Sequence, residues 1–310
     1  MKKMIVGSLI AAAFALTACG SQGAKESVAA KPAEITVTAA EGETTVPLNP
    51  KKVVVFDNSA IDTMDALGVG DRIIGAATTN MPDYLEAYQT VDSAGGIKEP
   101  DLEKINQMQP DLIIISGRQK DFEKELSAIA PTLFSSVDAT DTWQSIQNNI
   151  LTIGEIFDKK ELAEEKITEL SQKITKTKEQ AEVTEEKALI VLVNEGSLSA
   201  YGMGSRFGII HDTFGFPTAD DNIEASTHGQ SVSYEYLLEK NPDILFVIDR
   251  TKAIGGDTSE SQLVENQLVQ QTNAGKNGKV INLDPQVWYL SGSGLESLEI
   301  MLEDVNQVFE

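Results

Sequence analysis

The chain has 310 residues, of which 41% are hydrophobic, so it is long enough to bury the cores of two lobes. Its formal net charge of −23 argues against nucleic acid as a partner, because contacts to phosphates need a basic surface. The negative charge does not exclude a small anionic ligand, whose site need be basic only locally.

The first residues predict a lipoprotein leader followed by a tether. Two lysines precede an apolar run from Met4 to Ala18, which is typical of a secretory signal and too short for a comfortable membrane span. Leu16-Thr17-Ala18-Cys19 resembles a bacterial lipobox, so we expect residues 1–18 to be removed and Cys19, the only cysteine, to carry lipid. Residues 19–34 suit a flexible tether to the extracytoplasmic face of the cell membrane. The alternative is a plain signal peptide with an incidental cysteine.

Residues 35–141 predict an N-terminal lobe in which strands and helices alternate. This alternation indicates an α/β lobe with a largely parallel sheet, whose ligands lie at the carboxyl ends of the strands. The predicted elements are a hairpin over 35–46, strands over 53–56, 72–75, 112–116 and 132–134, helices over 57–67 and 119–130, and a short helix before Pro110.

Residues 142–187 predict a connection between two lobes. A helix over 142–157 leads into a long helix from Asp158 to about Lys187, for which Asp158 is the expected N-cap and Glu161 its capping-box partner. About 24 helical residues span roughly 36 Å, more than the width of one small lobe. The alternative is an ordinary amphipathic helix within one domain. One apolar stripe recurs at spacings of four and three, through Ala163, Ile167, Leu170, Ile174, Thr177 and Ala181.

Residues 188–310 predict a C-terminal lobe of the same α/β kind. The predicted elements are strands over 188–193, 197–201, 244–248 and 280–282, helices over 209–214, 261–271 and 296–309, a short helix before Pro242, and loops over 202–208, 220–231, 253–257 and 284–294.

One helix–loop–strand pattern occurs on both sides of the long helix. In residues 102–115 and again in 234–248, a glutamate (Glu103, Glu235) opens a short helix, a Pro-Asp pair follows seven residues on, and an apolar run begins at once. An arginine, Arg118 or Arg250, lies just past each apolar run. A unit used twice predicts two similar lobes that face one cleft.

Three arginines in predicted loops are the strongest candidates for ligand binding. Arg118, Arg206 and Arg250 all have small residues such as glycine or serine close by in sequence, which would let a ligand approach the guanidinium. A planar, permanently charged fork suits an anionic ligand with flat aromatic oxygens. The alternative is three surface arginines that pair with the abundant carboxylates.

His228 and Tyr289 are candidate metal ligands. His228 lies in a polar loop, Tyr289 follows Trp288 in another loop, and a phenol bound to a metal would lose its proton. The alternative for both is ordinary packing. A third possibility, an extracytoplasmic enzyme with His228 as base, is disfavoured because the chain has no phosphate-binding loop, His-Glu-x-x-His or Gly-x-Ser-x-Gly motif.

Several motifs together resemble the helical-spar (class III) substrate-binding proteins of ABC importers. These are the lipobox, the segments 50–57 and 66–75, both glutamate-helix units and the long helix. Within that class, the chain resembles the binders of catecholate siderophores, of the enterochelin and petrobactin type. The motifs that carry this closer resemblance are Ser116-Gly117-Arg118, Ser205-Arg206-Phe207-Gly208, His228, Asp249-Arg250 and Trp288-Tyr289-Leu290-Ser291.

The resemblance implies two Rossmann-like lobes joined by a single long helix, with the ligand in the cleft between them. It implies a ferric catecholate as ligand, no intrinsic cofactor, and a monomer that serves an ABC permease and its ATPase without making or breaking a bond. Haem, cobalamin or a hydroxamate siderophore are the alternative cargoes. The implied roles are ligand binding for Arg118, Arg206, Arg250 and Trp288, iron coordination for His228 and Tyr289, permease docking for Glu103 and Glu235, and lipidation for Cys19.

Overall fold

The computed structural model describes residues 33–256 and 263–310. The predicted signal peptide, Cys19 and nearly all of the predicted tether lie outside the described residues, as does the start of the helix predicted over 261–271. Nothing in the structure therefore tests the lipoprotein leader.

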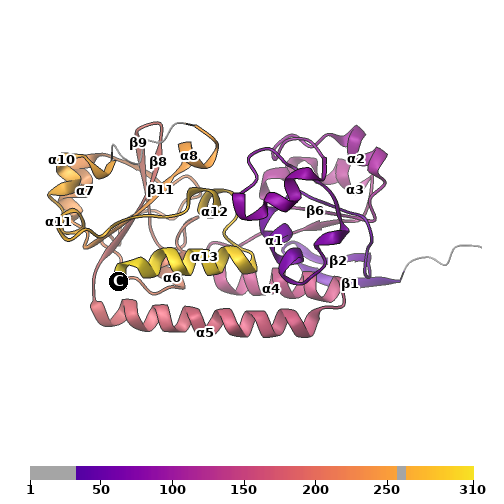
Figure 1. Cartoon of the computed structure of the whole chain (residues 1–310), viewed down its shortest axis with the longest axis horizontal. Helices are drawn as coiled ribbons and strands as arrows, with labels where there is room; N and C mark the ends of the chain where they lie inside the picture. Colours follow the sequence, from indigo (N-terminus) through magenta and orange to yellow (C-terminus); the bar gives the residue numbers. More distant parts are fainter. Residues whose placement is uncertain (1–32, 257–262) are drawn as a thin grey trace, which may run out of the picture. The chain divides into compact units, whose positions relative to one another are not determined.

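Two five-stranded sheets, one in each lobe, form the frame of the protein (Figure 1). The N-terminal sheet has the order β5-β4-β3-β6-β7, and its neighbouring strands are all parallel. Its central strands are runs of Val, Leu and Ile that are buried on both faces, as expected where helices cover a parallel sheet. The strands are β3 (Val53–Val55), β4 (Ile73–Ala76), β5 (Asp92–Ser93), β6 (Leu112–Ile115) and β7 (Thr132–Phe134).

The C-terminal sheet has the order β10-β9-β8-β11-β12 and is mixed. Strands β8, β11 and β12 are parallel to one another. At one edge of the sheet, β9 pairs with β8 in the antiparallel direction, and β10 pairs with β9 in the antiparallel direction. The two-residue turn between β8 and β9 has positive φ at Glu195 and Gly196, which is the usual hairpin geometry. The strands are β8 (Ala188–Asn194), β9 (Ser197–Tyr201), β10 (Gln230–Val232), β11 (Ile244–Asp249) and β12 (Val280–Asn282).

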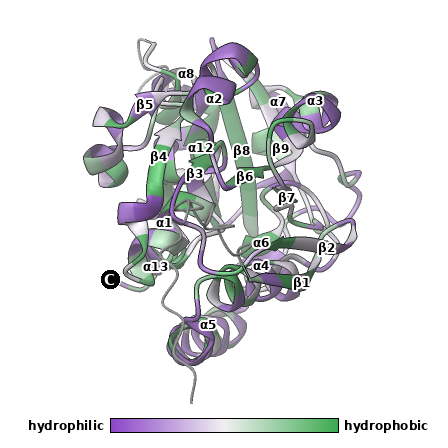
Figure 2. Ribbon diagram, turned by 90° about the vertical axis from the view of Figure 1, so that its right-hand side faces the viewer, coloured by the Kyte–Doolittle hydropathy of each residue, from purple (hydrophilic) through white to green (hydrophobic). Residues whose placement is uncertain are grey.

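Helices surround the sheets, and the hydrophobic residues gather on the central strands (Figure 2). The predicted hairpin is present as β1 (Glu34–Ala39) and β2 (Gly42–Pro47). The N-terminal helices are α1 (Asn58–Ala66), η1 (Gly70–Arg72), η2 (Asp83–Thr90), α2 (Leu102–Met108), η3 (Gly117–Phe122), α3 (Glu123–Ser127) and α4 (Thr142–Ile156). The later ones are α5 (Lys160–Thr184), α6 (Ile209–Asp212), α7 (Tyr234–Lys240), α8 (Arg250–Ala253), α10 (Gln267–Gln270), α11 (Asn273–Asn277), α12 (Pro285–Leu290), α13 (Leu295–Asn306) and η4 (Gln307–Phe309).

Helix α5 runs beneath both lobes and confirms the predicted long helix (Figure 1). It has 25 residues, and the six residues of the predicted apolar stripe are all buried. The predicted cap is wrong, because the N-cap is Lys159 and Asp158 has a φ of 57°. Asp158 instead ends the preceding helix, since the Lys159 N–H donates to the Gly154 carbonyl of α4 at 2.7 Å.

Helix α13 lies along α5 and reaches α1 of the N-terminal lobe (Figure 1). Lys173 of α5 pairs with Glu299 of α13 at 2.5 Å, and the Thr177 hydroxyl donates to Asn306 at 3.0 Å. The two lobes are thus joined by α5 and also by the segment that carries α13.

The structure corrects four predicted elements. The predicted loop 284–294 contains α12, because Pro285 is its first residue and the Asp284 carboxylate accepts the N–H groups of Gln286 and Val287. The predicted loop 253–257 is preceded by the short helix α8, and the predicted loop 220–231 ends in strand β10. The helix predicted over 119–130 is divided into η3 and α3. No helix among the described residues is long and apolar enough to cross a membrane.

Candidate functional site

Tyr289, near the end of α12, is the point on which the three predicted arginines converge. The guanidinium groups of Arg118 and Arg206 donate to the Tyr289 carbonyl oxygen at 3.1 and 2.7 Å. Arg250 donates from Nε to the Tyr289 phenol oxygen at 2.8 Å. The structure therefore brings Arg118, Arg206, Arg250 and Tyr289 together, although 171 residues separate the first from the last.

The arginines come from both lobes: Arg118 and Arg250 follow strands that run parallel to their central neighbours, whereas Arg206 follows β9, which is antiparallel to β8. Arg118 lies in η3 after β6, Arg206 lies in the loop after β9, and Arg250 begins α8 directly after β11. The guanidinium carbon of Arg206 lies 4.3 Å from the centre of the Tyr289 ring, and that of Arg250 lies 5.5 Å from it. Both distances suit cation–π contacts, so the ring and the carbonyl together hold like charges close to one another.

Two residues that the sequence analysis did not single out support the arginines. The Asn194 side-chain oxygen accepts a hydrogen bond from Arg250 Nη1 at 2.7 Å. Asp57, the N-cap of α1, provides a negative charge near Arg118. Asp57 and Asn194 lie at the carboxyl ends of β3 and β8, which is the signal that would have identified them.

The electrostatics of this cluster make the Tyr289 phenol easier to ionise than an ordinary tyrosine. Burial alone would raise the pKa of the phenol, but the hydrogen bond from Arg250 and the charge of Arg206 outweigh burial, so the pKa is lowered from its ordinary value. The pKa of Arg118 is lowered by burial and by repulsion from Arg206, yet an arginine keeps its charge at neutral pH. Burial raises the pKa of Asp57, and the nearby charge of Arg118 opposes that shift.

A cavity of about 520 Å³ opens beside this cluster, between the two lobes. Its lining includes Arg118 and hydroxyl groups from the N-terminal lobe, and Arg206 with Phe207 from the C-terminal lobe. Tyr289 also lines the cavity, whereas Arg250 contacts the Tyr289 phenol without belonging to the lining. The arrangement can hold an anion, because two cations and several hydroxyl groups face a partly enclosed space.

Trp288 lines the cavity with Tyr289, whereas His228 does not. Trp288 is only 3% exposed, and its indole N–H donates to the Asp304 carboxylate at 2.9 Å. His228 is exposed, and its neighbour Thr227 lines the cavity while His228 does not. Among the described residues, no contact joins His228 to Tyr289, so the structure does not bring the two predicted iron ligands together.

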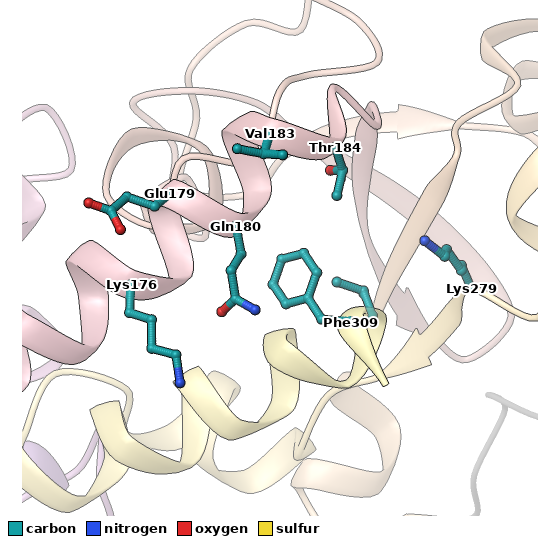
Figure 3. Close-up of a pocket in the computed structure, with 8 residues that line it drawn as sticks. Lys176, Glu179, Gln180, Val183, Thr184, Lys279 and Phe309 are labelled. Carbon is teal, nitrogen blue, oxygen red and sulfur yellow. The ribbon is translucent and has the colours of Figure 1, made fainter.

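A second hollow lies at the far end of α5 and lacks these features (Figure 3). Its volume is about 570 Å³, and its lining combines the exposed Val183 with Phe309 and side chains of either charge. Neither an arginine nor a tyrosine lines it, and it is more open to solvent than the cavity between the lobes. Of these two hollows, only the cavity beside Tyr289 has arginines and a tyrosine in or against its wall, as an anionic aromatic ligand would require.

The family model for periplasmic binding proteins matches residues 53–287, which is most of the chain and includes all three arginines of the cluster. The chain belongs to the periplasmic binding protein family. The α/β lobes joined by α5 confirm the predicted helical-spar architecture for this family member.

Close relatives within this family bind siderophores. The petrobactin-binding protein YclQ of Bacillus subtilis is 45% identical over 303 residues, which cover 96% of each chain. Its crystal structure superposes with a TM-score of 0.88 at 46% identity, covering 90% of this chain and 99% of that one. The ferric-anguibactin-binding protein FatB of Vibrio anguillarum is 35% identical over 85% of this chain and 84% of its own. The structure of the catecholate-siderophore-binding protein VctP of Vibrio cholerae superposes with a TM-score of 0.84 at 33% identity. The match covers 89% of this chain and 100% of that one.

The two glutamate-helix units predicted for this periplasmic binding protein are present and alike. Glu103 is the second residue of α2 and Glu235 the second residue of α7, and both side chains are exposed. Each helix ends in a left-handed residue, Gln109 or Asn241, before the Pro-Asp pair and the buried strand. The chain therefore presents one exposed carboxylate at an equivalent position on each lobe.

Proposed function

We propose that this protein captures a ferric catecholate siderophore in the cavity between its lobes and delivers it to an ABC permease for iron import. The observation that carries the proposal is the convergence of Arg118, Arg206 and Arg250 on Tyr289 at that cavity. The siderophore-binding relatives support the class of ligand. As a binding protein, it would release the complex chemically unchanged.

The charge of the arginines suits the charge of the ligand. Three doubly ionised catechols around Fe³⁺ carry a net charge of about −3, and at ~5 Å with an effective dielectric near 20 each charge pair contributes on the order of 3 kcal/mol before desolvation. Each guanidinium has five N–H donors, and Arg118 and Arg206 each use one on the Tyr289 carbonyl. The remaining donors are available for catecholate oxygens.

Tyr289 is proposed to coordinate iron directly when the siderophore supplies only two catechols. A bis-catecholate leaves two iron positions open, and a phenolate is a suitable oxygen ligand for one of them. The arginines that lower the pKa of Tyr289 make the required loss of the phenol proton easier. His228 is proposed as the second ligand, which requires its exposed loop to turn toward the cavity when the complex binds.

Glu103 and Glu235 are proposed to dock the two lobes onto basic residues of the permease. Their equivalent, exposed positions on α2 and α7 support this role, because one carboxylate on each lobe can engage a permease with two similar halves. The alternative to permease docking is a local role, in which each glutamate stabilises the first turn of its own helix through the helix dipole.

Lipidation of Cys19 is proposed to anchor the protein on the extracytoplasmic face of the cell membrane. The lipobox sequence supports the proposal, as do relatives that are named ABC substrate-binding lipoproteins.

Ferric bis- and tris-catecholates should quench the tryptophan fluorescence of the purified protein at micromolar concentration, whereas a ferric hydroxamate, which is less anionic, should not. Arg118→Gln or Arg206→Gln should each weaken tris-catecholate binding by roughly 10-fold or more, because each removes a charge pair with the ligand. Arg72→Gln is the matched control, since Arg72 is the chain's remaining arginine and lies outside the cavity. A flat titration with both catecholates would refute the proposed ligand.

Tyr289→Phe and His228→Ala should weaken bis-catecholate binding much more than tris-catecholate binding, because only the former complex has open iron positions. Since the Tyr289 phenol must lose its proton to bind iron, bis-catecholate affinity should also fall as the pH drops below the pKa of Tyr289, and this dependence should be weaker in Tyr289→Phe. Equal losses for both complexes would remove the direct-ligand role.

A Glu103→Ala, Glu235→Ala double variant should bind the ferric complex normally as purified protein but fail to support uptake of radioactive iron by cells. The matched control is a double change of exposed glutamates on α5, Glu164→Ala with Glu179→Ala. Normal uptake by the docking variant would show that the two carboxylates act only within their own helices.

Cys19→Ser should abolish labelling with radioactive palmitate and shift the protein from the membrane fraction to the soluble fraction, because the acyl chains supply the membrane affinity. Membrane retention without labelling would exclude the lipid anchor.

A further inference from the structure

We propose that Asp62 of the N-terminal lobe is a positioning residue for Tyr289, and that α1 thereby strengthens the binding of ferric complexes with open iron positions. The inference rests on the proposed function and assigns a role to a buried cluster that no predicted site residue belongs to. The cluster joins the polar face of α1 to the segment that immediately follows Tyr289.

Hydrogen bonds from α1 hold the chain on the C-terminal side of Tyr289. The Asn58 side chain donates to the carbonyl of Leu290 at 3.1 Å. Ser59 accepts from the backbone N–H of Ser293 at 3.2 Å and from its hydroxyl at 2.8 Å. Asn58 and Ser59 are 4% and 5% exposed, and Ser59, Leu290 and Ser293 line the cavity, so these bonds join α1 to the chain at the wall of the site.

Asp62 fixes the far end of the same segment. Its two carboxylate oxygens accept the N–H groups of Glu296 and Ser297 at 2.8 Å each, so a side chain of one lobe caps α13. The side chain is 1% exposed, and a Cβ added at Gly294 would collide with its carboxylate. A carboxylate at the N-terminus of a 12-residue helix is also favoured by the helix dipole.

A third attachment comes from η2 of the N-terminal lobe. The Tyr84 phenol lies 2.6 Å from the Ser291 hydroxyl and donates to the Asp62 carboxylate at 3.2 Å. Gln286, at the other end of α12, accepts from the backbone N–H of Asp83 at 2.9 Å. The segment that bears Tyr289 is therefore held by the N-terminal lobe on both sides.

Only four residues separate Tyr289 from Gly294, so a shift at the start of α13 is passed to the tyrosine. The Tyr289 carbonyl is held by Arg118 and Arg206 and the phenol oxygen by Arg250, while the segment that follows fixes the backbone from which the phenol extends. A complex that needs the phenolate oxygen as an iron ligand depends on that direction. A complex whose iron is already saturated depends only on the arginines.

The test compares Asp62→Asn with Asp65→Asn, the same change one turn further along α1. Asp65 is exposed and bonds to Tyr88 rather than to the segment after Tyr289. Asp62→Asn should weaken ferric bis-catecholate binding by about 10-fold or more, because an amide cannot accept from both N–H groups, and should reduce the phenolate-to-iron absorption band. Tris-catecholate binding should change by no more than about twofold, and Asp65→Asn should leave both affinities within that range.

The absorption band and the ratio of the two affinities separate positioning from mere loss of structure, which would weaken both complexes alike. Asn58→Ala is the second variant in case Asp62→Asn does not fold; it should give the same selectivity with a smaller loss, since it removes one neutral bond. If the unaltered protein binds neither complex, the proposed function fails and this inference with it. If it binds both and the two variants leave the ratio and the band unchanged, only the role of Asp62 is refuted.

Discussion

The Tyr289 carbonyl, held between the guanidinium groups of Arg118 and Arg206, is the contact on which the site depends. One arginine comes from each lobe, so this single oxygen fixes the distance between two like charges and between the lobes that carry them. Without an acceptor between them, the two cations would repel each other in a partly buried cleft. With it, they form a local positive region in a chain whose net charge is −23.

That local charge makes a strongly acidic chain compatible with the anionic ligand proposed for it. The energy of a charge pair in a cleft depends on distance and local dielectric, and charges on the outer surface are screened by salt beyond about 10 Å. The Tyr289 ring contributes as well, because its face attracts Arg206 while its phenol accepts from Arg250. The same residue thus orders the arginines and, in the proposed function, would offer its phenol oxygen to iron.

The two lobes are joined more firmly than a single long helix would require. Helix α5 runs beneath both sheets, and α13 lies along it with its N-terminus capped by Asp62 of the opposite lobe (Figure 1). Leaving such buried polar groups without hydrogen-bond partners would cost free energy, so these contacts favour one arrangement of the lobes. The site is therefore held in place by the part of the structure that connects the lobes.

The sequence by itself determined the elements whose signal is local. The β-branched runs of β3, β6, β8 and β11, the apolar stripe of α5 and the repeated glutamate-helix units could all be read from spacing, because burial on a strand or helix face repeats with a fixed period. The three arginines and Tyr289 could be chosen from their small neighbours and their positions after strands, and the structure brings them together.

Only the tertiary structure decided which side chains meet. The burial of Trp288, the exposure of His228, and the supporting roles of Asp57 and Asn194 depend on contacts between segments far apart in the chain, which leave no periodic trace. Asp158 was misread for a related reason: its local sequence suits a helix start, but the sharp turn between α4 and α5 places it in a left-handed conformation. The local sequence limits the conformations that a residue can adopt, and the packing of segments far apart in the chain selects one of them.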